Sequence, residues 1–269
     1  MLHSQKLDCL GITEANLRKE ADVQEITKPG YKLVRDLGMN KDINNNSRVV
    51  AYIKEEISYQ VIKNLMGGDL MPEVWLKLGH TGTRRTLIGF IYREQKPWKS
   101  RDDSVQGQEE RFKVWLEARR PVWSGVEETF ILGNVNLDWR RQGDPKYRNS
   151  KMLKKKLEKE LADLGWTQIV KRNTHYSNRN GALSESLIDL IWTNRPIKVK
   201  GCGHEEMSAS DHQLVWVDRS ASNLVEKVKE TEKRIMKNYK AEILEDLCRK
   251  ESWSHQTQSE EQKTELEGQ

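Results

Sequence analysis

The chain has no long hydrophobic run: none of its apolar stretches approaches the roughly 20 residues that a membrane-spanning helix requires. Its first residues, MLHSQK, lack the apolar core of a signal peptide. Cysteine is scarce, and Cys9, Cys202 and Cys248 are odd in number, widely scattered and without the spacing of a zinc site. These absences argue against a membrane span and a disulfide framework, and we expect an intracellular protein.

The composition is that of a folded, polar domain. The 269 residues are 36% hydrophobic and 32% charged, and nine Trp and seven Tyr supply enough large apolar side chains for one core. The net charge of +5 is unevenly distributed, since residues 140–172 contain eleven Lys and Arg against four Asp and Glu, a local balance of +7. Such a basic segment suits a phosphate backbone, although a solvated helix face explains it equally well.

Short β-rich runs between Gly, Pro and polar breaks predict strands at 9–12, 49–53, 74–78, 86–92, 129–132, 187–191 and 213–217. The runs 49–53 and 86–92 are apolar almost throughout, as in strands that are covered on both faces. Helical spacing of apolar residues predicts helices at 104–117 and 150–164, and Gly165 ends the second.

The pattern changes after residue 219, and we assign the compact domain to residues 1–219. Residues 220–252 keep apolar side chains at helical spacing behind a capping box of Asn223 and Glu226, which predicts a helical extension. Residues 253–269 are rich in Gln, Glu, Ser and Thr, and we expect a disordered tail.

Several predicted strands end in polar side chains, where the loops of a rigid sheet commonly carry functional groups. The residues at these ends are Glu14, Tyr92, Asn134, Asn136, Asp189, Asp211 and His212. Asp189 also lies within an apolar run, where an unpaired carboxylate would be costly, so we expect it to have a partner.

Five segments resemble, in order and spacing, the endonuclease/exonuclease/phosphatase superfamily, which includes apurinic endonucleases and DNase I-like enzymes. They are ITEANL at 12–17, GFIYRE at 89–94, LGNVN at 132–136, SLIDL at 186–190 and SDH at 210–212. Each motif is weak alone, but the ordered set over about 200 residues is a strong signal. The residue sequences of the first two segments resemble the endonuclease domain of non-LTR (LINE-type) retrotransposons. Residues 237–253 resemble the linker that leads from this domain towards a reverse transcriptase.

The resemblance implies an α/β fold: a two-sheet β-sandwich flanked by helices, the four-layer DNase I-like arrangement. It implies a Mg²⁺-dependent endonuclease, with Mn²⁺ as a possible substitute, that nicks DNA to prime reverse transcription. DNA and a reverse transcriptase supplied by the parent element would be its partners, and a functional protein would act in the nucleus. No motif supports a lipid or inositol phosphatase.

The resemblance also implies roles for the residues at the strand ends. Glu14 would be the main Mg²⁺ ligand and Asp211 would lie beside the metal, directly or through water. Asp189 would hold one ring nitrogen of His212 so that the other faces the phosphate. Tyr92 and Asn136 would donate hydrogen bonds to the phosphoryl oxygens.

Each of these residues also has an ordinary alternative reading. Glu14 is compatible with an exposed charge, Tyr92 with a core ring whose hydroxyl reaches water, and Asn136 with a turn. Asp189 is compatible with a strand-edge carboxylate and Asp211 with a turn or cap. The remaining histidines, among them His175, show no partner pattern and are interpreted as surface residues.

Asn134 departs from the family's Gly-Asp-x-Asn motif, in which the aspartate orients and deprotonates the attacking water. An asparagine amide cannot accept that proton, so we expect activity to be reduced. Asp138 lies close by in sequence but is not expected to replace the base. The alternative is an inactive remnant that binds nucleic acid through residues 140–172.

Glu14 also stands early in the chain. In the family, a strand ending in a supporting asparagine precedes the metal-binding glutamate by some twenty residues or more. Position 14 leaves no room for that strand, so we expect a sheet without its first strand, with an exposed edge and lowered stability.

Overall fold

The computed structural model describes residues 7–18, 20–36, 47–65, 71–79, 85–93, 104–140, 148–179, 181–208 and 210–219. The chain divides into two compact units, Met1–Lys227 and Val228–Gln269. The predicted helical extension and tail, at 220–252 and 253–269, lie outside the described residues, so these assignments stay predictions.

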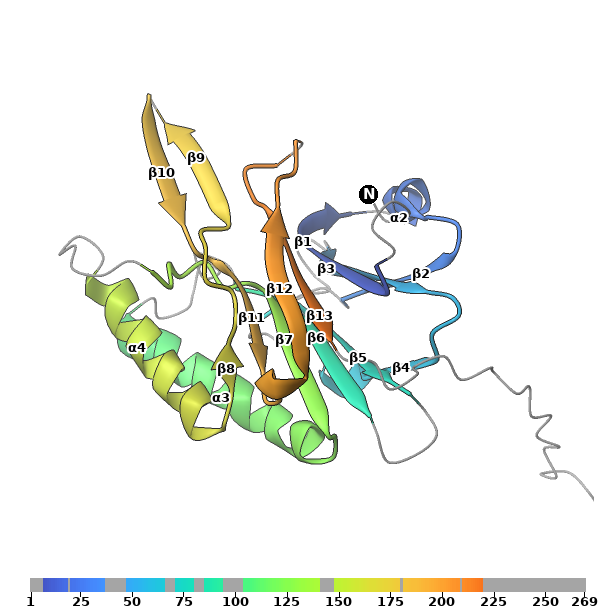
Figure 1. Cartoon of the computed structure of the whole chain (residues 1–269), viewed down its shortest axis with the longest axis horizontal. Helices are drawn as coiled ribbons and strands as arrows, with labels where there is room; N and C mark the ends of the chain where they lie inside the picture. Colours follow the sequence, from blue (N-terminus) through green and yellow to red (C-terminus); the bar gives the residue numbers. More distant parts are fainter. Residues whose placement is uncertain are drawn as a thin grey trace, which may run out of the picture. The chain divides into compact units, whose positions relative to one another are not determined.

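A mixed sheet of six strands forms the centre of the first unit (Figure 1). Its strands, in spatial order, are β4 (Tyr59–Val61), β5 (Glu73–Leu78), β6 (Thr86–Tyr92), β7 (Glu128–Asn134), β11 (Asp189–Thr193) and β8 (Thr167–Gln168). Strands β6 and β7 are parallel, and the other neighbouring pairs are antiparallel. Helix α3 (Val105–Ser124) connects β6 to β7, because a parallel pair requires a crossover connection.

Further strands lie in smaller sheets. Strands β1 (Cys9–Leu17), β3 (Ser47–Lys54) and β2 (Tyr31–Arg35) form a sheet in the order β1-β3-β2, and β12 (Val199–Glu205) pairs with β13 (Leu214–Arg219). Strands β9 (His175–Arg179) and β10 (Ala182–Ser186) form a hairpin that extends beyond the sheets (Figure 1). The remaining elements are α2 (Glu20–Ile26), α4 (Arg148–Asp163) and the 3₁₀ turns η1 (Lys63–Leu65) and η3 (Pro196–Lys198).

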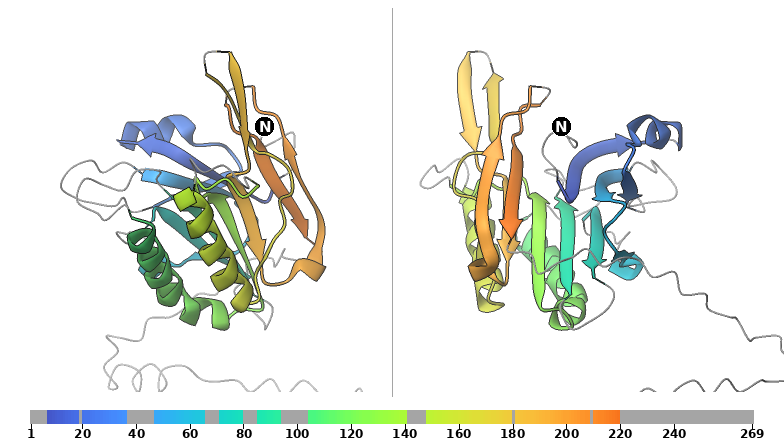
Figure 2. Two further views of the ribbon diagram at one scale, coloured as in Figure 1. Left: turned by 90° about the vertical axis from the view of Figure 1, so that its left-hand side faces the viewer. Right: turned by 45° about the vertical axis from the view of Figure 1, so that its right-hand side comes forward.

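The alternation of side chains along the central strands produces two cores, one on each face of the central sheet. On β6, Leu87 and Ile91 belong to the core that includes the helices, whereas Phe90 and Tyr92 belong to the core shared with β3. Figure 2 shows α3 and α4 on one side of the central sheet and the sheet of β1–β3 on the other. The predicted two-sheet sandwich flanked by helices is therefore confirmed.

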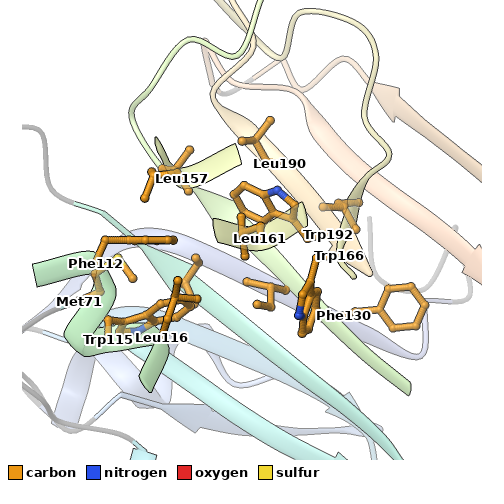
Figure 3. Packing of buried hydrophobic residues seen from close by; sticks show 14 of the residues in the cluster. Met71, Phe112, Trp115, Leu116, Phe130, Leu157, Leu161, Trp166, Leu190 and Trp192 are labelled. Carbon is orange, nitrogen blue, oxygen red and sulfur yellow. The ribbon is translucent and has the colours of Figure 1, made fainter. Parts of the chain in front are cut away.

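The two long helices follow their sequence signals. Ser104 caps α3 by accepting a hydrogen bond from the backbone N–H of Gly107 at 3.0 Å, and the helix continues seven residues past the predicted end at 117. Helix α4 packs Leu153, Leu157 and Leu161 into the core. Helix α3 contributes the aromatic rings of Phe112 and Trp115 to the same core (Figure 3). Neither helix, nor any other in the described part of the chain, is long and apolar enough to cross a lipid bilayer.

Most predicted strands are present with shifted ends. The run at 86–92 coincides with β6, whereas the prediction at 9–12 falls short of β1, which continues to Leu17. Strands β2, β4, β8, β9, β10 and β12 were not predicted, because their sequences are short or mainly polar. Strand β1 is hydrogen-bonded to β3 alone among the described strands, so it forms an edge of its sheet in the described part of the chain.

A buried carboxylate ties α3 to the central sheet. Glu73 on β5 is fully buried and accepts hydrogen bonds from the indole N–H groups of Trp75 (2.8 Å) and Trp115 (2.9 Å). Arg119 on α3 forms an ion pair with it, and its Nε donates to Oε2 of Glu73 at 3.1 Å. Each polar atom of this carboxylate is thus paired, which burial demands.

Replacing Arg119 with Met should destabilise the fold by about 3–5 kcal/mol, because Glu73 would keep a buried charge without its counter-ion. The matched control is Arg120→Met, since the neighbouring Arg120 is exposed and pairs with Glu117 at the surface. That control should change stability by less than about 0.5 kcal/mol. Urea unfolding measures both, and equal midpoints for the two variants would contradict the assignment.

Candidate active site

Three predicted site residues lie in one row across the central sheet. Asn134 at the end of β7 is directly opposite Tyr92 on β6 and opposite Asp189 on β11. Residues paired in this way point to the same face of a sheet, with side chains about 5 Å apart. The register therefore brings Tyr92, Asn134 and Asp189 together, although 97 residues separate the first from the last.

An irregular segment of β1 brings Glu14 to this row. The register of β1 against β3 shifts between Thr13 and Leu17, and Glu14 and Asn16 have φ angles of 59° and 53°. Such a bulge turns side chains away from the regular alternation of a strand. As a result, Oε1 of the exposed Glu14 lies 3.4 Å from Nδ2 of Asn134.

The amide of Asn134 is fixed at both ends. Its side chain is buried at 1% exposure, and its Oδ1 accepts a hydrogen bond of 2.7 Å from the backbone N–H of Asn136. Because this N–H can only donate, the NH₂ group must point towards Glu14, to which it donates. Asn134 thus supplies a donor to Glu14 at the position where the family's motif has a carboxylate.

Gly133 allows β7 to approach β6 closely beside this residue. Its φ is 149°, and a Cβ at this position would lie 1.9 Å from the carbonyl oxygen of Ile91. Only glycine fits such a backbone conformation and approach.

Asn136 is held in the left-handed region, with φ of 50°. Its Nδ2 donates to the carbonyl of Arg93 at 2.7 Å, and Nη1 of Arg93 donates back to the carbonyl of Val135 at 3.0 Å. These reciprocal contacts fasten the loop after β7 to the end of β6. Asp138 further along accepts from the backbone N–H of Leu187 at 3.2 Å, so it anchors the loop to the segment before β11.

Arg48 is a site residue that the sequence analysis missed. Its Nη1 donates to Oδ1 of Asn16 at 2.7 Å and its Nη2 to the hydroxyl of Tyr92 at 3.2 Å. Burial raises the pKa of Tyr92, and the nearby Glu14 carboxylate raises it further against the opposing effect of Arg48. Tyr92 therefore keeps its proton and can donate it in a hydrogen bond. The available signal was an arginine at the start of the apolar run 49–53.

The structure brings Asp189 and His212 together. Oδ2 of Asp189 lies 2.9 Å from Nδ1 of His212 and also accepts a hydrogen bond of 2.8 Å from Oγ1 of Thr174. Burial favours the neutral ring of His212, but the hydrogen bond and charge of Asp189, with the charges of Asp211 and Glu14, outweigh it and raise the pKa of His212. The Nε2 atom takes no part in this contact.

His175 was interpreted as a surface residue without a partner, and this interpretation is wrong. It begins β9, forms an isolated bridge with His212, and its ring lies 4.7 Å from that of His212. Its Nε2 lies 3.2 Å from Oδ2 of Asp211, and its Nδ1 lies 3.3 Å from Oγ of Ser186. No local sequence signal could reveal this, because the bridge joins residues 37 positions apart.

The basic segment 140–172 is largely helix α4, with residues 141–147 outside the described part. Lys156 pairs with Glu109 on α3, and the ammonium of Lys154 lies 5.5 Å from the ring centre of Trp139. Lys155 and Lys159 are exposed. Part of this charge therefore supports helix packing, and the rest faces solvent.

Solved structures share this fold. The endonuclease domain of TRAS1, a telomere-specific non-LTR retrotransposon, has a TM-score of 0.59 and 13% identity over 82% of this chain and 90% of that one. The catalytic domain of Xenopus laevis APE2 gives 0.57 and 14% over 82% and 87%, and an AP endonuclease from Archaeoglobus fulgidus gives 0.51 and 17% over 82% and 91%. No family model and no curated protein matches the sequence. At these identities the likeness establishes the fold that the motifs predicted.

Replacing Asp189 with Asn should lower the pKa of His212. The carboxylate charge stabilises the imidazolium ring, and without it burial favours the neutral ring. The NMR titration of the His212 ring protons should therefore move to lower pH. The control is Asp211→Asn, which should cause a smaller shift because Asp189 contributes more to the raised pKa. An unchanged midpoint in Asp189→Asn would refute this pairing.

Proposed function

We propose that the protein is a divalent-metal-dependent phosphodiesterase that nicks DNA. The observation that carries this proposal is the convergence of Glu14, Asn134 and the Asp189–His212 pair at one end of the central strands. A carboxylate, amide donors and an oriented imidazole are the groups that phosphodiester hydrolysis requires. The shared fold with nucleases agrees with this assignment.

Glu14 would hold the metal, with Asp211 nearby. The exposed Glu14 carboxylate and the neighbouring Asn16 amide are oxygen donors, which suit Mg²⁺ or Mn²⁺. When bound, this ion would neutralise charge on the phosphate and on the leaving oxygen.

The other residues would bind and orient the phosphate. Tyr92 keeps its proton and can donate it, and the Asn136 amide lies at the same strand end. Asp189 holds Nδ1 of His212, so Nε2 can donate to a phosphoryl oxygen when the ring is protonated. Arg48 adds a fixed positive charge beside Tyr92.

The proton of the attacking water has no strong acceptor at Asn134. This neutral amide can orient a water but cannot remove its proton. General-base catalysis commonly contributes about 10²–10⁴-fold to a rate. We therefore propose that this chain nicks DNA slowly.

The proposed biological role is that of a retrotransposon endonuclease, whose nick primes reverse transcription in the nucleus. This role is supported by the sequences of the motifs and by the fold shared with the TRAS1 domain. In this proposal, residues 1–219 form the nuclease, residues 220–252 a linker and residues 253–269 a loose tail. The reverse transcriptase would come from the parent element.

A second candidate is an inactive remnant that binds nucleic acid through residues 140–172. The observation that favours it is the amide at position 134, which donates to Glu14 and accepts from Asn136 where a base would be needed. The exposed Lys155 and Lys159 on α4 would contribute to such binding.

Restoring the base with Asn134→Asp should raise the rate of supercoiled-plasmid nicking in Mg²⁺ by about 10²–10⁴-fold. Nicking should disappear with EDTA and in the double variant Asn134→Asp, His212→Ala, which excludes a contaminating nuclease. Nicking by the unaltered chain at the rate of the variant would contradict the role of Asn134.

Thermal unfolding of the Asn134→Asp variant tests metal binding independently of nicking activity. The Asn134→Asp substitution would place a second carboxylate beside Glu14, where the amide nitrogen now lies 3.4 Å away. Like charges at this distance repel, and a bound cation relieves the repulsion. Mg²⁺ should therefore raise the Tm of the variant more than that of the unaltered chain. If the Tm responds but nicking stays absent, inactive binding is the better explanation.

A further inference from the structure

Next to the Asp189–His212 pair lies a second group of possible metal ligands. One donor atom each from His175, Asp211 and His212 lies within 4.8 Å of the others. The three residues come from β9 and from the segment before β13, and the bridge between His175 and His212 fixes these two pieces of chain together. His175 has no part in the proposed hydrolysis, whereas Asp211 and His212 belong to both groups.

The Nδ1 atom of each imidazole ring already has an oxygen partner. Nδ1 of His212 lies 2.9 Å from Asp189, and Nδ1 of His175 lies 3.3 Å from Oγ of Ser186. Metal-binding histidines are oriented in this way, because an oxygen partner at one nitrogen fixes the ring and leaves the other nitrogen as the ligand. Both rings are thus prepared to bind an ion through Nε2.

One pair of donors already has the spacing that a tetrahedral ion needs, and all three donors lie within 4.8 Å of one another. Ligands at the usual distances from zinc lie about 3.4 Å apart. Nε2 of His175 and Oδ2 of Asp211 are already 3.2 Å apart. The Asp211 side chain is 59% exposed, so it can adjust to an ion, and a fourth position would remain for water.

The donor set selects the class of cation. Two imidazoles and one carboxylate suit zinc and similar borderline ions, whereas Mg²⁺ prefers oxygen ligands. We propose that His175, Asp211 and His212 form a zinc-class cation site that is separate from the Mg²⁺ ligand Glu14.

Zinc at this site would inhibit the nuclease. It would occupy Nε2 of His212, which is the atom assigned to the phosphate, and it would draw Asp211 away from the neighbouring Mg²⁺. This consequence rests on the proposed function, whereas zinc binding itself does not.

Binding is tested first, by competition of the tag-free protein with a chromophoric chelator for Zn²⁺ in a buffer with excess Mg²⁺. The unaltered chain should take up one zinc ion, and His175→Ala should weaken the affinity by at least about 10-fold, the usual effect of losing even an outer-shell partner. His204→Ala on β12 is the matched control, because His204 lies outside the cluster, and it should leave the affinity unchanged. Glu14→Gln should also bind zinc normally.

Ser186→Ala provides a second test that leaves all three ligands in place. Loss of the oxygen beside Nδ1 of His175 should weaken zinc binding by about 10-fold. Equal zinc affinity in the unaltered chain, His175→Ala and Ser186→Ala would overturn the site, as would displacement of zinc by Mg²⁺.

Inhibition is tested on the Asn134→Asp protein, in which nicking is expected to be measurable. Zinc should abolish its Mg²⁺-dependent nicking, and adding His175→Ala should restore nicking in the presence of zinc. Zinc that binds but leaves nicking unchanged, or supports it, would overturn the inhibitory role. If no variant nicks DNA, the proposed function fails, while the chelator competition still decides the zinc site.

Discussion

The site depends on the hydrogen-bond register of β6, β7 and β11. This register places Tyr92, Asn134 and Asp189 in one row, and a slip of one residue in any of the strands would turn its side chain to the opposite face. Gly133 is required for this register, because a side chain at this position would collide with the backbone of β6. Buried cores on both faces of the sheet resist such a slip further.

Around this row, neighbouring strands and loops bring further charged side chains. The bulge in β1 directs Glu14 to Asn134, and the segment before β13 brings His212 to Asp189. Arg48 on β3 donates a hydrogen bond to the hydroxyl of Tyr92 and opposes the effect of Glu14 on the pKa of Tyr92. The rigid sheet therefore fixes the buried members of the site, Tyr92, Asn134 and Asp189, and the segments around it bring the more exposed Glu14 and His212.

Much of this arrangement could be predicted from the sequence, because strongly apolar runs such as β6 end at the polar residues that the motifs contain. Asp189 was expected to need a partner because it lies in an apolar run, and the structure places it against His212. His175 could not be predicted and Arg48 had only a weak signal beside the run 49–53, since each reaches the site through pairing with residues distant in the sequence. Periodicity describes which face of an element is buried, but it does not describe which loops meet.

An amide rather than a carboxylate at position 134 lowers the negative charge of the site. A carboxylate there would face Glu14, and the repulsion would have to be offset by a bound cation or by protonation. Asn134 instead donates to Glu14 and accepts from the backbone of Asn136. An amide at this position therefore avoids the electrostatic penalty that a carboxylate would carry beside Glu14. This neutral residue is compatible with the fold and with the geometry of the site.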